Sequence, residues 1–210
     1  MKLAVLASGT GTNLQALLDQ VHGREGIEIV AVGSDQAAAP ALARARRAEV
    51  PVHAFPTAEF SDRSARDAAM AGWLAGQGVE LVVLAGYMAL LSPAFLERFP
   101  DRVINVHPAL LPAFPGLRAI QQALDYGVKV FGVTVHFVDS GVDSGPVILQ
   151  RAVEIPAPAS AQDVEATLHQ IEHQLLPQAV RLIAAGAVSF DPVNPRHVVI
   201  DPNRSTRSAS

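Results

Sequence analysis

The chain has 210 residues, of which 50% are hydrophobic, with no cysteine and a formal net charge of −4. This length suits one α/β domain or two small ones. The lack of cysteine excludes disulfides, thiolate metal sites and a cysteine nucleophile, and the acidic balance argues against a nucleic-acid partner. The N-terminal apolar run is too short for a signal peptide, and no segment approaches the ~18 apolar residues of a membrane helix. We therefore expect a cytoplasmic protein without a membrane partner.

In the first half of the chain, apolar runs of strand length alternate with helix-like stretches, which is the pattern of βαβ units. The runs LAVLA, IVAV and LVVLA lack period-2 alternation, as expected of parallel strands covered on both faces. The predicted strands are Leu3–Ala7, Ile27–Gly33, Val52–Phe55, Leu81–Ala85 and Val103–Val106. The predicted helices are Asn13–Val21, Ala38–Ala48, Asp62–Ala75 and a short one that ends at Phe99, capped by Ser92 with Pro93 as its first residue.

The pattern changes after about Gly127. Val133–Val138 and Val147–Ile155 are predicted strands joined by the short loop DSGVDSGP, which favours antiparallel pairing. A long helix is predicted over Ala161–Ala185. We thus expect an α/β fold: an open, mostly parallel, twisted, Rossmann-like sheet with helices on both faces and antiparallel strands toward the C-terminal part. Residues 1–190 are predicted as one domain and residues 191–210 as a C-terminal extension whose polar end is disordered.

The stretch LASGTGTNL (Leu6–Leu14) joins the first predicted strand to the first helix, a common place for a phosphate at a helix N-terminus. The dinucleotide fingerprint fails because its third glycine position is Leu14, and the lysine of a P-loop is missing. What remains is a nest of backbone N–H groups over residues 9–13, which suits one phosphate monoester. The alternative is an ordinary glycine turn in which Thr12 or Asn13 caps the helix.

Asn105 and His107 lie at the carboxyl end of a predicted central strand, where open α/β sheets place their ligands. They are two residues apart, so their side chains project to the same side of an extended backbone. Pro108 keeps His107 extended, and two further prolines stiffen the loop that follows. We interpret the prolines as holding two polar groups in fixed positions. A cis bond at one of them is compatible with this role.

The loop DSGVDSGP offers Asp139 and Asp143 as partners for His107. A nearby carboxylate would favour the imidazolium, which with the Asn105 amide would make a donor pair for a developing oxyanion. No serine or cysteine is placed as a nucleophile. The pattern therefore indicates acyl transfer by direct attack of a substrate amine. His136 is a rival for this role, but a mid-strand histidine is better interpreted as supporting the site or the core.

The segment His169–His173 matches the H-x-x-E-H pattern of inverted zinc proteases. Histidines four residues apart on a helix can share a zinc ion. No third ligand is evident from the sequence. Glu172 can equally reach toward a site at the ends of the strands, so we do not predict a metal.

Taken together and in order, the motifs SGTGTNLQAL, LAGYMALLSPAFL, INVHPALLPAFPGL, GVTVHFVDSGVDSGPVILQ and IEHQLLP resemble the folate-dependent formyltransferase family over about residues 3–185. The N-x-H-P-x-L-L-P element with the later D-x-G-P is shared by the wider family and gives the chemistry. The SGxGxNL turn is the more selective part. It resembles the branch that formylates the amine of 5'-phosphoribosylglycinamide in purine biosynthesis, with 10-formyltetrahydrofolate as co-substrate and no metal.

The resemblance implies a role for each matching residue. His107 would polarise the formyl oxygen and donate a proton, Asp143 would favour its protonated form, and Asn105 would bind the oxyanion. The residues implied to bind the ribonucleotide are Gly11, Thr12 and Asn13 in the N-terminal half, together with Glu172. Those implied for the folate are Arg63, Met88, Ala89, Leu90, Leu91, Asn105, Val138 and Asp139, the loop 138–142 lining the pterin pocket in the C-terminal half.

The sequence departs from the family pattern at two positions. Ala89 stands where a longer, often basic, side chain is expected, and Arg118 where a second histidine can occur. Both departures concern folate affinity and the pterin contacts, and they leave the reaction unchanged.

Four other functions have to be compared with this one. A methionyl-tRNA formyltransferase should carry a further basic domain after the region found here, and a formyltetrahydrofolate deformylase a regulatory domain before it. A non-catalytic nucleotide-binding module is disfavoured by Leu14, and a zinc hydrolase lacks a third ligand. Small-molecule substrates are thus the expected partners, and the sequence leaves the oligomeric state open, with a homodimer as one option.

Overall fold

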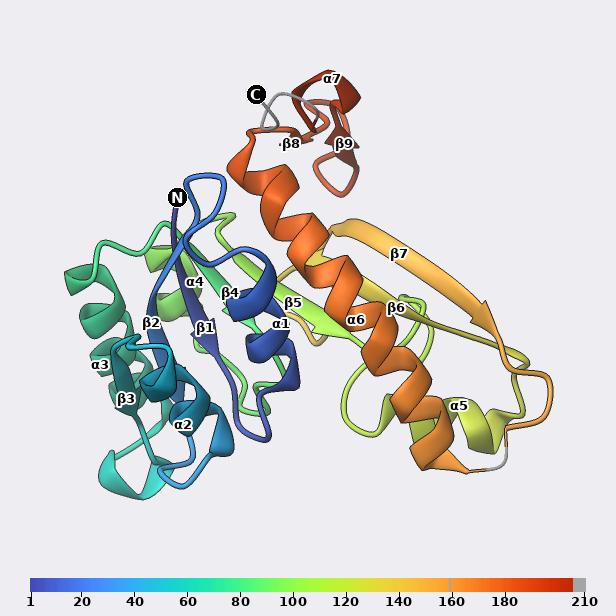
Figure 1. Ribbon diagram of the computed structural model, residues 1–210, viewed down its shortest axis with the longest axis horizontal. Coiled ribbons are helices and arrows are strands. Elements are labelled where there is room, and N and C mark those ends of the chain that lie inside the picture. The colour runs from blue at the N-terminus through green and yellow to red at the C-terminus, as the bar shows by residue number, and fades with distance from the viewer. Residues whose placement is uncertain (159, 206–210) are drawn as a thin grey trace. The chain divides into compact units, whose positions relative to one another are not determined.

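The computed structural model describes residues 1–158 and 160–205 (Figure 1). The chain folds into two compact units whose boundary lies between Asn105 and Val106, within one strand. Among the described residues, no helix is both long and apolar enough to span a membrane.

The first unit is built on parallel strands in the order β3-β2-β1-β4-β5. Their bounds are β1 (Lys2–Leu6), β2 (Glu28–Ser34), β3 (Val52–Ala54), β4 (Leu81–Leu84) and β5 (Val103–His107). β1 and β4 are almost wholly buried, which explains their continuous apolar sequences. The order reverses at β1 and β4: the chain first moves outward from β1 to β3 and then returns through β4 to β5. Such a reversal is where open α/β sheets bind ligands.

Helices cover both faces of these strands. They are α1 (Thr12–Gln20), α2 (Pro40–Arg47), α3 (Arg63–Gly76) and α4 (Pro93–Arg98), with a 3-10 turn η1 (Thr57–Glu59) before α3. Because crossovers between parallel strands are right-handed, α1 and α2 pack on one face and α3 and α4 on the other (Figure 1). The Ser92 side chain accepts the N–H of Phe95 and Pro93 opens α4, so the predicted cap is confirmed.

The second unit is built on an antiparallel pair of strands, β6 (Val130–Phe137) and β7 (Val147–Glu154), against which the long helix α6 (Ala161–Ala184) packs (Figure 1). The unit also contains α5 (Ala119–Tyr126), the hairpin β8 (Val188–Phe190) and β9 (Val198–Ile200), and the short helix α7 (Pro202–Ser205). The predicted fold class is confirmed: parallel strands with helices on both faces, and an antiparallel pair in the C-terminal part.

Three parts of the second unit differ from the sequence prediction. α5 was not predicted, because Arg118, in a left-handed conformation, precedes it in place of a polar cap. The β8–β9 hairpin was missed because each strand has only three residues. α7 lies where disorder was expected, and the Asp201 N–H, which donates to the Ala187 carbonyl, ties its start to the chain after α6. The remaining predicted tail, residues 206–210, lies outside the described residues.

Candidate active site

The glycine turn after β1 and the segment after β4 lie side by side where the strand order reverses. The Ser8 N–H donates to the Gly86 carbonyl at 3.0 Å, and the Met88 N–H donates to the Ser8 hydroxyl at 2.8 Å. The structure therefore brings together two of the segments that the sequence marks as binding segments. Both lie in the first unit, at the carboxyl ends of neighbouring parallel strands.

The turn is shaped by Gly11, which adopts a left-handed conformation (φ 72°) at the N-cap position of α1. A Cβ atom there would lie 2.7 Å from the Ala41 Cβ and 2.8 Å from its Cα, so only glycine fits. Neither Thr12 nor Asn13 is the N-cap residue, so the capping interpretation was wrong. Because glycine has no side chain, no side-chain cap hydrogen bond forms at the start of α1.

The Ser8 hydroxyl links the turn to two neighbouring segments. It donates to the Asp35 carboxylate at 2.5 Å while it accepts from the Met88 N–H. Its proton is therefore directed to Asp35, and Ser8 joins the turn to the segment after β4. The sequence reasoning did not single out Asp35, which follows directly after β2.

His107 is the last residue of β5, and it is buried, with 5% of its surface exposed. Its Nε2 lies 2.9 Å from the Phe114 carbonyl oxygen, and its Nδ1 lies 3.3 Å from Asp143 Oδ2. Both ring nitrogens thus face oxygen acceptors, and only the imidazolium can donate to both at once. Asn105, two residues earlier, is partly buried and pairs with Leu84 of β4. The predicted contact between His107 and Asp143 is present.

Asp143 also contacts two groups that the sequence did not assign to it. Its Oδ2 accepts the Gly116 N–H at 2.8 Å, and its Oδ1 lies 3.6 Å from His136 Nε2. Burial raises the pKa of the Asp143 carboxyl, but the hydrogen bonds from His136 and Gly116 and the charges of His107 and His136 outweigh it, so the pKa falls to about 2. The carboxylate is therefore charged at neutral pH and lies between two histidines.

His136 owes this contact to a local irregularity in the sheet. The register of β6 against β7 shifts between Val135 and His136, and such a bulge changes the direction of the next side chain. His136 is buried and its Nδ1 lies 2.8 Å from the Phe137 carbonyl oxygen. It thus supports the carboxylate, as the sequence interpretation of a supporting histidine expected.

The loop 138–145 that carries Asp143 is held by its own side chains. Asp139 accepts the Gly141 N–H at 3.0 Å and the Ser144 hydroxyl at 2.6 Å. At Gly145 a Cβ atom would lie 1.8 Å from the Phe137 carbonyl oxygen, so the loop can close against the end of β6 only with glycine there. Asp139 therefore fixes the loop in this structure, and its predicted contact with folate stays a prediction.

The contribution of Asp143 to the stability of the protein should be lost at low pH. Its carboxyl has a pKa of about 2 in the folded protein, against 3.8 for an ordinary aspartate. A lowered pKa contributes stability above about pH 4, and this contribution is lost as the pH falls toward 2, on the order of 1–2 kcal/mol in all. In urea unfolding, the wild type should exceed Asp143→Asn in stability at pH 6, and the difference should shrink at pH 2.5. A difference that is constant with pH would contradict this assignment.

The proline-containing loop after His107 is tied to the strands behind it. The Thr134 hydroxyl accepts the Leu111 N–H at 3.1 Å and donates to the Ala109 carbonyl at 2.7 Å. The Gln150 amide donates to the Leu111 carbonyl at 2.8 Å. The Leu111-Pro112 bond is cis, and a cis bond at one of these prolines is compatible with the sequence analysis. The loop therefore presents the Phe114 carbonyl to His107 from a fixed position.

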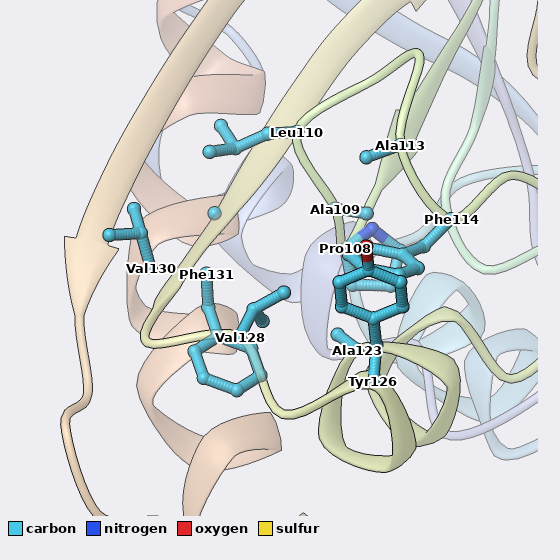
Figure 2. Close-up of a pocket in the computed structure, with 11 residues that line it drawn as sticks. Pro108, Ala109, Leu110, Ala113, Phe114, Ala123, Tyr126, Val128, Val130 and Phe131 are labelled. Carbon is cyan, nitrogen blue, oxygen red and sulfur yellow. The ribbon is translucent and has the colours of Figure 1, made fainter.

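Behind this loop lies an apolar cavity of about 420 Å³ (Figure 2). Phe114 and Tyr126 lie together at its edge, with ring centroids 5.9 Å apart. The residues that line it carry no charged side chain, so it offers no partner for a phosphate or a carboxylate. The cavity is therefore not the predicted substrate site.

The residues predicted to contact folate in the first unit fall into two groups. Arg63 is exposed and is the first residue of α3. Met88 and Leu90 are 60% and 56% exposed, with Ala89 and Leu91 partly buried between and beside them. The segment after β4 thus presents two large apolar side chains to the outside. Val138, in the second unit, is partly buried at the end of β6.

Glu172 is buried on α6, although glutamate is rarely buried without a partner. The His169 Nε2 lies 3.9 Å from a Glu172 carboxylate oxygen, and the His169 and His173 rings stack with centroids 6.0 Å apart. Burial and the neighbouring His169 charge lower the pKa of His173. Over residues 1–158 and 160–205, no three His, Cys, Asp or Glu side chains form a group suited to a metal ion.

Comparison with known proteins adds to this geometry. Residues 1–180 match the model of a family described as formyl transferase. The chain is 45% identical over 192 residues to a phosphoribosylglycinamide formyltransferase of Mycobacterium tuberculosis, covering 90% of this chain and 87% of the relative. It is 40% identical over 186 residues to that of Haemophilus influenzae, covering 88% of each. The crystal structure of glycinamide ribonucleotide transformylase 1 from Symbiobacterium toebii matches with a TM-score of 0.91 and 47% identity, over 95% of this chain and 93% of that one.

Proposed function

The chain belongs to the formyl transferase family, and from this premise we propose that it formylates the amine of 5'-phosphoribosylglycinamide in purine biosynthesis. The donor is 10-formyltetrahydrofolate, and the products are the formylglycinamide ribonucleotide and tetrahydrofolate. Residues 1–190 act as one formyltransferase domain. The substrate assignment is supported by relatives that bear this name at 40–45% identity over most of their length.

The observation that carries the proposed chemistry is the buried contact of His107 Nδ1 with Asp143 Oδ2, at 3.3 Å. A charged carboxylate on one nitrogen stabilises the imidazolium, whose other N–H can then serve a developing oxyanion. In the unliganded protein that Nε2 faces the Phe114 carbonyl. We infer that the formyl oxygen of the donor replaces this carbonyl as the acceptor when the substrate binds.

The reaction then needs no covalent intermediate with the enzyme. The substrate amine attacks the formyl carbon, a new C–N bond forms, and the oxygen takes up negative charge that His107 and the Asn105 amide stabilise. The bond from that carbon to N10 of the folate breaks, and overall one proton moves from the amine to N10. His107 is the group placed to carry a proton in this exchange.

We assign the ribonucleotide phosphate to the turn formed by Gly11, Thr12 and Asn13. The left-handed Gly11 is the N-cap residue of α1 and forms no side-chain cap, and a helix N-terminus favours an anion. We assign Glu172 to the same substrate, because its carboxylate can accept hydrogen bonds from the substrate amine.

We assign the folate to Met88, Ala89, Leu90 and Leu91, with Arg63 as the partner for its glutamate carboxylates. The exposed apolar side chains of this segment suit a flat ring system, and an exposed arginine suits a carboxylate. Val138 and Asp139 line the pterin pocket in the same proposal. Binding of the ring would remove the large exposed side chains of this segment from water, and burial of apolar surface stabilises the complex.

The proposed function is tested by following folate absorbance with 10-formyltetrahydrofolate in the presence and absence of glycinamide ribonucleotide. Deformylation that requires the ribonucleotide supports the transfer. Deformylation at the same rate without it would indicate that water is the acceptor, and the enzyme would then be a hydrolase.

Gly11→Ala should weaken binding of the ribonucleotide more than binding of folate. The added Cβ would lie within 2.8 Å of Ala41 and must occupy a left-handed conformation, so the turn has to move. The KM for the ribonucleotide is expected to rise about tenfold or more, the loss of at least one charge-assisted hydrogen bond. Gly72→Ala, whose Cβ would meet nothing within 4 Å, is the matched control. An unchanged KM for the ribonucleotide in Gly11→Ala would rule out this turn as the phosphate site.

A further inference from the structure

The first end of the segment Gly86–Ser92 is held by a buried carboxylate acting through Ser8. Asp35 is buried, with 8% of its surface exposed, and its carboxylate accepts the Ser8 hydroxyl proton at 2.5 Å. The same hydroxyl accepts the Met88 N–H at 2.8 Å, and the Ser8 N–H donates to the Gly86 carbonyl. Ser8 is thereby oriented so that its lone pair, and not its proton, faces the segment.

The other end of the segment is held by a second buried carboxylate. Asp67 on α3 is fully buried, and its Oδ2 accepts the Ser92 N–H at 2.5 Å. Arg66 binds the Asp67 Oδ1 through Nε and a terminal nitrogen, and that nitrogen also donates to the Leu90 carbonyl at 3.0 Å. Burial of charge is costly unless the charges are paired and hydrogen bonded. Here the ion pair directs its remaining hydrogen bonds to the backbone of the segment.

Between these two ends the segment has no regular secondary structure, yet Met88 and Leu90 remain exposed. A mobile loop with such side chains would bury them against the protein surface. A backbone fixed at both ends instead keeps them outward, and a preformed surface loses less conformational entropy on binding.

We infer that Asp35 (through Ser8) and Asp67 (with Arg66) are positioning residues that fix the two ends of Gly86–Ser92, so that the segment meets the folate ring in a preformed shape. This rests on the proposed function, which assigns the ring to Met88–Leu91. None of the four residues touches the reacting atoms, so they should act on binding of the co-substrate and not on the chemical step.

Ser8→Ala is the variant that tests this with the least damage to the fold, because water can reach the exposed Met88 N–H. We expect the KM for 10-formyltetrahydrofolate to rise about three- to tenfold, the range of one hydrogen bond. The kcat and the KM for the ribonucleotide should change less than about twofold on the same scale. Ser8→Thr, which keeps the hydroxyl, should restore the wild-type KM.

Ser34→Ala is the matched control. Ser34 is fully buried at the end of β2, and its hydroxyl accepts the Gln36 N–H, which lies outside the segment.

Arg66→Lys tests the second anchor, because lysine keeps the charge beside Asp67 but loses the planar fork that also reaches Leu90. It should raise the same KM, and by a similar factor.

Amide hydrogen exchange provides a readout that needs no activity. The Met88 and Ser92 N–H groups should be protected in the unliganded protein, and Ser8→Ala should remove the protection of Met88 while Ser34→Ala leaves it. Fast exchange of both amides in the wild type would overturn the inference, as would a folate KM that Ser8→Ala leaves unchanged. If the wild type transfers no formyl group while both amides are protected and Ser8→Ala exposes Met88, the proposed function fails and the anchoring stands.

Discussion

Replacing His107 by alanine is expected to lower kcat at least about 10³- to 10⁴-fold, because one ring serves as both proton donor and oxyanion donor. The ring is buried between the Phe114 carbonyl and Asp143, so its removal also leaves that carboxylate with one partner fewer. Stopped-flow or steady-state folate absorbance measures the loss. Binding of folate should be largely retained, because the apolar segment assigned to the folate ring follows β4, whereas His107 ends β5.

His197→Ala is the control for this variant. His197 is an exposed histidine whose Nδ1 lies 3.7 Å from Asp191 Oδ2, and it is not among the residues assigned to catalysis. Its kcat should match that of the wild type. If His107→Ala, shown to be folded by its thermal transition, kept its kcat within tenfold, His107 would not be the proton donor.

Asp143→Asn is expected to lower kcat about 10²- to 10⁴-fold, as found for carboxylates that orient a catalytic imidazole. The change is nearly isosteric, and the amide oxygen can still accept the Gly116 N–H, so the loop should keep its shape. What is lost is the negative charge that lies between the His107 and His136 rings, 3.3 Å and 3.6 Å from their nearest nitrogens. The KM for the ribonucleotide should change little.

The pH dependence of kcat separates this role from a purely structural one. Asp143→Asn removes the charge that lies beside the His107 ring, so its pH profile should differ from that of the wild type. Asp125→Asn is the control: it changes an exposed carboxylate on α5 that accepts the Gln121 amide at 2.7 Å, and it should leave the profile unchanged. If the profile of Asp143→Asn coincided with that of the wild type, the proposed electrostatic role would be wrong.

The parts of the fold that could be predicted are those with a local signal. The continuous apolar runs gave β1 and β4 because both faces of those strands are buried. Ser92 followed by Pro93 gave the start of α4 because the cap is formed by residues close in sequence. α5 begins at a left-handed arginine, which has no such signal, although Gly127 at its C-terminal end could have indicated where it stops.

The site shows the same division. The spacing of Asn105 and His107 marks the end of a strand, and the glycines of the loop 139–145 mark a tight reversal, so both could be found from the sequence. The contact of His136 with Asp143 depends on a register shift in β6, and the bond of Ser8 to Asp35 depends on the pairing of β1 with β2. Such contacts join residues that are distant in sequence, and no local pattern specifies them.

The central claim is tested most directly by following a ¹³C label in the formyl group of 10-formyltetrahydrofolate by NMR, with glycinamide ribonucleotide and catalytic amounts of the protein. We predict that the label appears as a formamide on the glycinamide nitrogen, with tetrahydrofolate formed in equal amount. Label that appears as free formate, or that stays on the folate while the ribonucleotide is unchanged, would contradict the claim.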